Sequence, residues 1–74
     1  MARIPLAIDQ FNPQTQMALR ELNEALPSTL FVGSLGRDLW VAYPDGMDED
    51  KARDETRSAL AALGERGIRG VRLA

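Results

Sequence analysis

The sequence predicts a small α+β domain in which two helices cover one face of a four-stranded antiparallel sheet. Apolar and polar residues alternate over short segments near both ends of the chain and in its middle. Two other segments repeat apolar residues at helical spacing. The resulting order is strand, helix, strand, strand, helix, strand. The ferredoxin-like split β-α-β-β-α-β sandwich is the commonest way to close that order into two layers.

The length and composition limit how such a domain can be stabilised. The chain has 74 residues, so we expect one domain over residues 1–74. Domains of this size often need disulfides, a metal or self-association. The chain has no cysteine and no histidine, which excludes a disulfide framework and the usual zinc site. We therefore expect no cofactor and regard a homodimer as possible.

The absence of cysteine fits a cytoplasmic protein, and the hydropathy predicts no membrane partner. No apolar run approaches the roughly 20 residues of a transmembrane helix. The first residues have neither the charged region nor the apolar region of a signal peptide. Because the chain begins with Met1, we expect it to be a complete small protein.

The first half of the chain predicts a strand and then a helix. Residues 3–9 alternate, and Pro5 requires an unpaired position or a bulge because it has no N–H. Asn12 followed by Pro13 is typical of a helix start, and the helical pattern continues to Ala25. The expected buried stripe of this helix comprises Thr15, Ala18, Leu19, Leu22, Ala25 and Leu26.

The middle of the chain predicts a hairpin with strands over residues 29–33 and 38–43. Gly36 as the first residue of a two-residue turn suits type II′. That turn pairs Val32 with Val41 and Leu30 with Tyr43, and we expect these side chains, together with Leu39, to face the helices. The opposite, open face would then carry Phe31, Trp40 and Ala42, with Trp40 across from Gly33.

The last third of the chain predicts a second helix and a final strand over residues 68–73. Asp48 is the expected N-cap, and Gly64 is the expected residue after the helix end. The buried stripe comprises Ala52, Thr56, Ala59, Leu60 and Leu63.

Strand alternation assembles a candidate binding surface on the open face. Its expected members are Arg3, Ala7, Phe31, Trp40, Ala42 and Arg72. A Trp–Phe pair surrounded by arginines has the composition of an interaction hot spot. The alternative interpretation is that Trp40 is a core residue over which the sheet curls.

Part of the hairpin resembles the RNA-recognition family. Residues 30–35, Leu-Phe-Val-Gly-Ser-Leu, resemble its second ribonucleoprotein motif, and residues 40–43, Trp-Val-Ala-Tyr, resemble the end of its first. That family places the two motifs on its first and third strands. Here they fall on the second and third, and the first strand has no aromatic residue. We interpret the resemblance as an apolar hairpin and regard nucleic acid as an unlikely partner.

Between residues 45 and 55 lie six acidic and two basic residues. Their spacing does not match a calcium loop, and a helix start explains them through capping and the helix dipole. The acidic residues are Asp45, Asp48, Glu49, Asp50, Asp54 and Glu55. Without histidine or cysteine, no serine has an activating base, so we do not expect an enzyme.

These observations favour a protein-binding module that acts on a larger partner through the open face or the acidic helix. Small acidic phage or mobile-element inhibitors, including anti-CRISPR proteins, are similar in size and charge, and some present carboxylates to a nucleic-acid-binding complex. One alternative is a single-stranded nucleic-acid binder that stacks bases on Phe31 and Trp40, with Arg3, Arg37 and Arg72 on phosphates. The other is a homo-oligomer that buries its aromatic face between copies.

Overall fold

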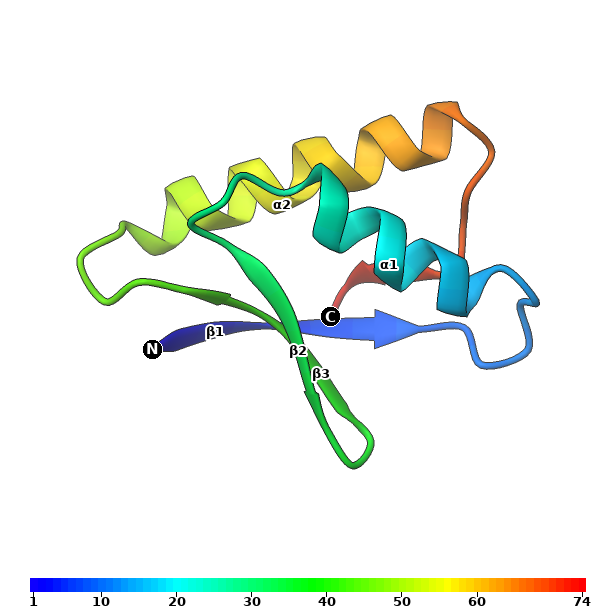
Figure 1. The fold of residues 1–74 in the computed structure, drawn as a ribbon, viewed down its shortest axis with the longest axis horizontal. Helices are drawn as coiled ribbons and strands as arrows, with labels where there is room; N and C mark the ends of the chain where they lie inside the picture. The colour runs from blue at the N-terminus through cyan, green and yellow to red at the C-terminus, as the bar shows by residue number, and fades with distance from the viewer.

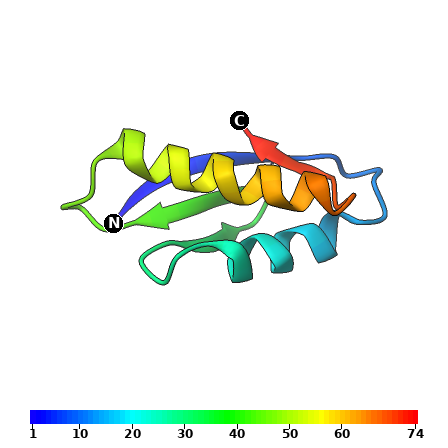
Figure 2. The same cartoon turned by 90° about the horizontal axis from the view of Figure 1, so that it is seen from above.

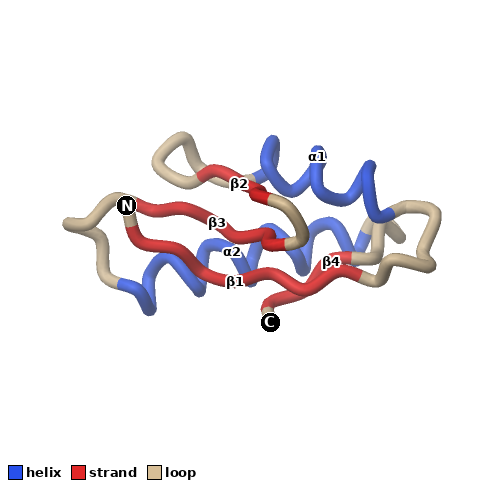
Figure 3. Tube along the Cα trace, turned by 90° about the horizontal axis from the view of Figure 1, so that it is seen from below, coloured by secondary structure: helices blue, strands red, loops and turns tan.

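In the computed structural model, which describes residues 1–74, two helices pack on one face of a four-stranded antiparallel sheet of order β2-β3-β1-β4 (Figure 1). The elements are β1 (Ala2–Ile8), α1 (Thr15–Ala25), β2 (Phe31–Leu35), β3 (Asp38–Tyr43), α2 (Glu49–Glu65) and β4 (Val71–Leu73). The view from above shows α2 in front of the strands and α1 beside it, next to β2, and the view from below shows the uncovered face of the sheet (Figures 2 and 3). The predicted ferredoxin-like α+β sandwich is confirmed.

Alternation along the central strands builds the core between sheet and helices. Ile4 of β1 and Val41 of β3 are partners in the register, and both are fully buried. Leu22 of α1 and Thr56 of α2 are also fully buried. The Thr56 hydroxyl donates to the Ala52 carbonyl oxygen at 2.8 Å, which satisfies its hydrogen-bonding capacity inside the core.

The hairpin has the predicted turn and the predicted pairing of Val32 with Val41, but the predicted pair of Leu30 with Tyr43 is not part of the ladder. Val32 pairs with Val41, and Gly33 pairs with Trp40. The turn consists of Gly36 and Arg37, with a φ of 61° at Gly36 and no positive φ at Arg37, as a type II′ turn requires. The strand before the turn nevertheless spans Phe31–Leu35, two residues later than predicted. A turn in which the Leu30 N–H donates to Pro27 keeps residues 29 and 30 out of the strand.

Helix α1 begins later than predicted, and its N-cap is Gln14 instead of Asn12. Asn12 Oδ1 accepts from the Gln14 N–H at 2.8 Å, which forms an Asx turn just before the helix. The Thr15 N–H then bonds the Asn12 carbonyl in a tighter, three-residue turn, so the regular helix starts only at Thr15. The predicted stripe is correct except for Ala25, which is exposed in the last turn.

Helix α2 continues past Gly64, so the predicted end was wrong. It ends in a Schellman motif in which the Gly67 N–H bonds the Gly64 carbonyl and the Ile68 N–H bonds the Leu63 carbonyl. Gly67 has a φ of 76°, the left-handed conformation that this motif needs. Leu63 and Ile68 are both buried, which ties the helix end to the core.

The last strand is shorter than predicted, spanning Val71–Leu73. It pairs only with residues Leu6–Ile8 of β1. Beyond the Leu6–Leu73 pair, the Pro5 carbonyl accepts from the Ala74 N–H at 3.1 Å. Pro5 has no N–H, so it cannot donate a second hydrogen bond that would extend the pairing. Neither helix combines the length and the apolar character needed to cross a membrane.

Candidate functional site

The open face of the sheet, on the side away from the helices, brings Phe31, Ala42 and Arg3 into one row across three strands. Ala42 is the register partner of both Phe31 and Arg3. Gly33, Trp40 and Pro5 form the next row in the same way. Ala42 is only 2% exposed although it lies on this face, because it sits between two large side chains.

Trp40 lies flat on this face and is half-buried there, so it is a surface residue of the sheet and not part of the core between sheet and helices. A Cβ placed on Gly33 would be 2.5 Å from Trp40 Nε1, which shows that the indole lies directly over this glycine. Arg3 Cζ lies 4.1 Å from the centroid of the Trp40 ring, in cation–π contact. The indole therefore packs against the backbone of Gly33, and the Arg3 guanidinium stacks on the indole.

A hollow of about 310 Å³ opens beside this stack. The β1–β3 pairing ends at Pro5 and Trp40, and beyond this point the hairpin projects away from β1 (Figure 1). The residues that line the hollow are Arg3, Pro5, Leu6, Arg37, Asp38, Leu39 and Trp40. Neither Arg3 nor Arg37 forms a salt bridge within the chain. The hollow therefore presents two unpaired guanidinium groups next to an indole.

The remaining open-face residues lie outside this hollow. Phe31 is 43% exposed, in the row beside Trp40. Arg72 is exposed on β4, where it pairs with Ala7, and it lines a separate hollow with Asp9 and Arg69. The structure thus brings Arg3, Arg37 and Trp40 together and places Arg72 apart from them.

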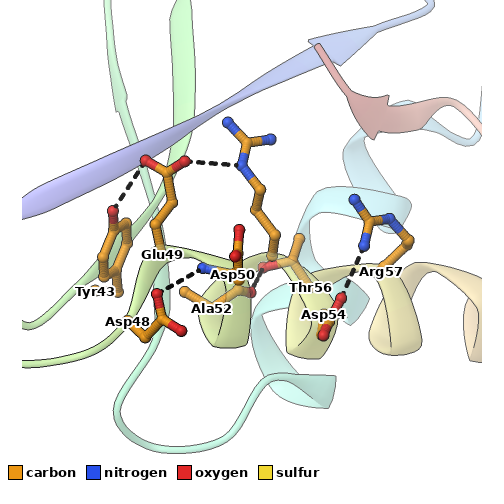
Figure 4. A network of polar contacts seen from close by, with 9 residues as sticks. Tyr43, Asp48, Glu49, Asp50, Ala52, Asp54, Thr56 and Arg57 are labelled. Carbon is orange, nitrogen blue, oxygen red and sulfur yellow. Dashed lines mark hydrogen bonds and ion pairs between the residues drawn. The ribbon is translucent and has the colours of Figure 1, made fainter.

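Most of the acidic residues make contacts within the chain (Figure 4). Asp48 Oδ1 accepts from the Asp50 N–H at 3.3 Å, which confirms Asp48 as the N-cap of α2. Glu49 accepts from the Tyr43 hydroxyl at 3.4 Å and from Arg53 Nε at 3.3 Å. These bonds explain two of the six acidic residues as parts of the helix start.

The other four acidic residues differ in their surroundings. Asp54 pairs with Arg57 at 2.9 Å, and Asp45 lies 3.5 Å from the N-terminal amine of Met1. Asp50 is exposed, whereas one oxygen of Glu55, Oε2, is buried without a hydrogen-bond partner. No group of three or more acidic side chains is placed to hold a metal ion.

The Tyr43 hydroxyl, at the end of β3, has a raised pKa. Burial raises its pKa above 10.0, and the negative charge of Glu49, which also accepts its hydrogen bond, raises it further. Tyr43 therefore remains protonated and links the end of β3 to the start of α2.

Sequence reasoning missed two features of this site. Pro5, Asp38 and Leu39 line the hollow, but their role depends on where the β1–β3 ladder ends. The alternation over residues 3–9 places Pro5 on the open face, so the sequence could have identified this residue as a member of the surface. The stacking of Arg3 on Trp40 had no sequence signal, because the two residues lie on different strands.

Comparison with protein-family models, with curated proteins and with solved structures gave no match.

Proposed function

We propose that the protein is a non-enzymatic binding module that docks a partner protein through the open face of its sheet. Trp40 is the anchor of this surface, and Arg3 and Arg37 are its charge partners. The observation that supports the proposal is the Arg3–Trp40 stack at 4.1 Å beside a hollow that also contains Arg37. Trp and Arg are the residues most enriched in interface hot spots.

The Arg3–Trp40 stack lowers the entropy cost of binding a partner. A free arginine loses about 0.5–1.5 kcal/mol of side-chain entropy when an interface immobilises it. Contact with the indole already restricts Arg3, so less remains to be lost. An unpaired guanidinium prefers a carboxylate with which it can form two parallel hydrogen bonds. The partner is therefore expected to place an acidic side chain over the hollow and an apolar group against Trp40.

A narrower form of the proposal is an inhibitor of the phage or mobile-element type that blocks a larger protein. Its support is the small size of the chain and its net charge of −2. If such an inhibitor imitated nucleic acid, it would use the carboxylates at the start of α2. Several of these are engaged within the chain, whereas Arg3 and Arg37 form no salt bridge, so the sheet face is the better supported surface.

Single-stranded nucleic acid is the second candidate, and the arginines on an aromatic sheet face favour it. A base could stack on Trp40 only by displacing Arg3 or by stacking on its guanidinium. This candidate predicts that binding of an oligothymidylate falls steeply with salt and is lost in Trp40→Ala.

Affinity capture from lysate with matched variants tests the proposal. The double variant Arg3→Glu/Arg37→Glu and the single variant Trp40→Ala should both lose the captured protein. Arg69→Glu is the control, because Arg69 is also an exposed arginine without a salt bridge but lies outside the hollow. Circular dichroism establishes that each variant is folded.

The outcomes separate the candidates. Loss of a protein partner in the sheet-face variants, with retention in Arg69→Glu, supports the proposal. Loss only in Asp48→Lys/Glu49→Lys would move the interface to α2 and overturn the role of the sheet face. Recovery of nucleic acid that disappears in Trp40→Ala would favour the second candidate.

A further inference from the structure

The outer edge of the sheet at β2 has little protection against pairing with another strand. Residues 31–35, Phe-Val-Gly-Ser-Leu, contain no charge and no proline, the usual means of protecting an edge strand. Leu35 pairs with Asp38 across the two-residue turn, so alternate residues from Leu35 backwards bond to β3. The peptide groups of Val32 and Ser34 therefore point outwards.

One side chain occupies part of this edge. Asn23 of α1 accepts from the Val32 N–H at 2.8 Å through Oδ1, which confirms that this donor points away from β3. No hydrogen bond joins the Ser34 N–H to another group of the chain across this edge. The edge thus has one donor bonded to a side chain and a second donor free.

We propose that two copies of the chain pair edge to edge through β2, antiparallel and with the two-fold axis at Gly33. In this register Val32 of one copy lies opposite Ser34 of the other, and each pair exchanges backbone hydrogen bonds. The two sheets then form one continuous eight-stranded sheet. The open faces of both copies lie on the same side, so the surface around Trp40 remains accessible.

The open-face side chains support this register. Phe31 and Leu35 are 43% and 73% exposed, although both are large and apolar. With Gly33 on the axis, Phe31 of each copy faces Leu35 of the other, so two apolar pairs form at once. A two-fold interface requires such reciprocal pairing. An unrelated peptide would not be expected to carry apolar side chains at both matching positions. We therefore infer that a second copy of the chain occupies this edge.

The helix side of the edge is hollowed. A groove of about 290 Å³ runs between α1 and β2, and Leu19, Asn23 and Ser34 are among its lining residues. Val32 of the second copy lies opposite Ser34 and therefore points into this groove. The exposed side of α1 carries both Arg20 and Glu24. The α1 helices of the two copies therefore do not present charges of a single sign to each other.

Cysteine cross-linking tests the register directly, since the natural chain has no cysteine. Phe31→Cys and Leu35→Cys are prepared as separate single variants and oxidised alone or mixed. In the proposed register, positions 31 and 35 of opposite copies face each other, with Cα atoms about 4.5–5.5 Å apart, within the range of a disulfide. Identical positions lie about 13 Å apart, four residues along the strand. The mixture should therefore cross-link much faster than either variant alone; equal rates in all three samples would overturn the register.

Sedimentation equilibrium tests the pairing without cysteines. Leu35→Lys should raise the dimer dissociation constant about 100-fold, because the lost apolar contact occurs twice. Ser34→Pro removes a donor that bonds nothing within one copy and should also give monomer. Asn23→Ala should tighten the dimer by freeing the Val32 N–H. Phe11→Lys is the control, since Phe11 is 89% exposed but lies outside β2.

The results distinguish this proposal from the proposed function. Dimers that persist in Trp40→Ala and dissociate in Leu35→Lys support edge pairing, whatever the captured partner. A parent chain that remains monomeric at millimolar concentration, or a dimer unaffected by both Ser34→Pro and Leu35→Lys, would overturn it.

Discussion

Replacing Gly33 with alanine should displace Trp40 and destabilise the protein. The new Cβ would lie 2.5 Å from Nε1 and 2.8 Å from Cε2 of the indole. Non-bonded heavy atoms of this kind prefer about 3.5 Å or more, so the ring must move by about 1 Å. Such overpacking costs about 1–3 kcal/mol, and part of the cation–π contact with Arg3, about 0.5–2 kcal/mol, is also lost.

An opposing term reduces this loss. Alanine is favoured over glycine in a strand by about 0.5–1 kcal/mol, because its unfolded backbone has less freedom. The net expectation is a decrease of about 1–2 kcal/mol in the free energy of unfolding, which lowers Tm by about 5–15 °C in a domain of this size. Thermal unfolding measures this change. Trp40 is the only tryptophan, so its fluorescence reports the displacement separately.

A double-mutant cycle decides whether the indole is the cause. In a Trp40→Ala background the clash is absent, so Gly33→Ala should be neutral or stabilising by up to about 1 kcal/mol. The coupling between the two positions should therefore be about 2 kcal/mol. If Gly33→Ala has the same effect in both backgrounds, or leaves stability and tryptophan fluorescence unchanged, the packing of the Trp40 indole against Gly33 is refuted.

Two further predictions concern the start of α2. Tyr43 is the only tyrosine, so its ultraviolet absorbance should titrate with a midpoint above 10.0. Because the folded state favours the protonated hydroxyl, its stabilising contribution is complete below pH 10 and is lost as the pH rises through the raised pKa. Glu49→Gln should lower the midpoint only in part, since burial is the larger cause, and a parent midpoint at 10.0 would contradict this. Asp48→Ala should reduce the free energy of unfolding by about 1 kcal/mol, whereas Asp48→Asn should retain most of the capping bond. Equal losses in both variants, measured by denaturant unfolding, would argue against the cap.

The elements were predictable because their signals are local. A helix stripe such as Ala18 and Leu22, or alternation such as Ile4 and Leu6, is encoded within a few residues. The hairpin register followed from the two-residue turn at Gly36 alone. The same alternation placed Trp40 on the face opposite Leu39 and Val41, but it left open whether the sheet curls over this residue. The structure decided that Trp40 lies outside the core between sheet and helices.

The errors occurred where tertiary contacts outweigh local preference. Gly64 is a plausible helix end in isolation, but ending the helix at Gly67 instead brings Leu63 and Ile68 together in the core. The last strand was predicted too long, because only three residues of β1 remain available to pair with it beyond Pro5.

The sequence alone determined the order of the elements, the two faces of the sheet and the residue types that each face carries. Only the tertiary structure decided that Arg3 stacks on Trp40, that Arg37 joins them around one hollow, and that Arg72 lies apart. The physical reason is the range of the interactions involved. Periodicity and turn chemistry act between neighbours in the chain, whereas the distance between side chains on β1 and β3 depends on strand register, twist and the point at which their ladder ends.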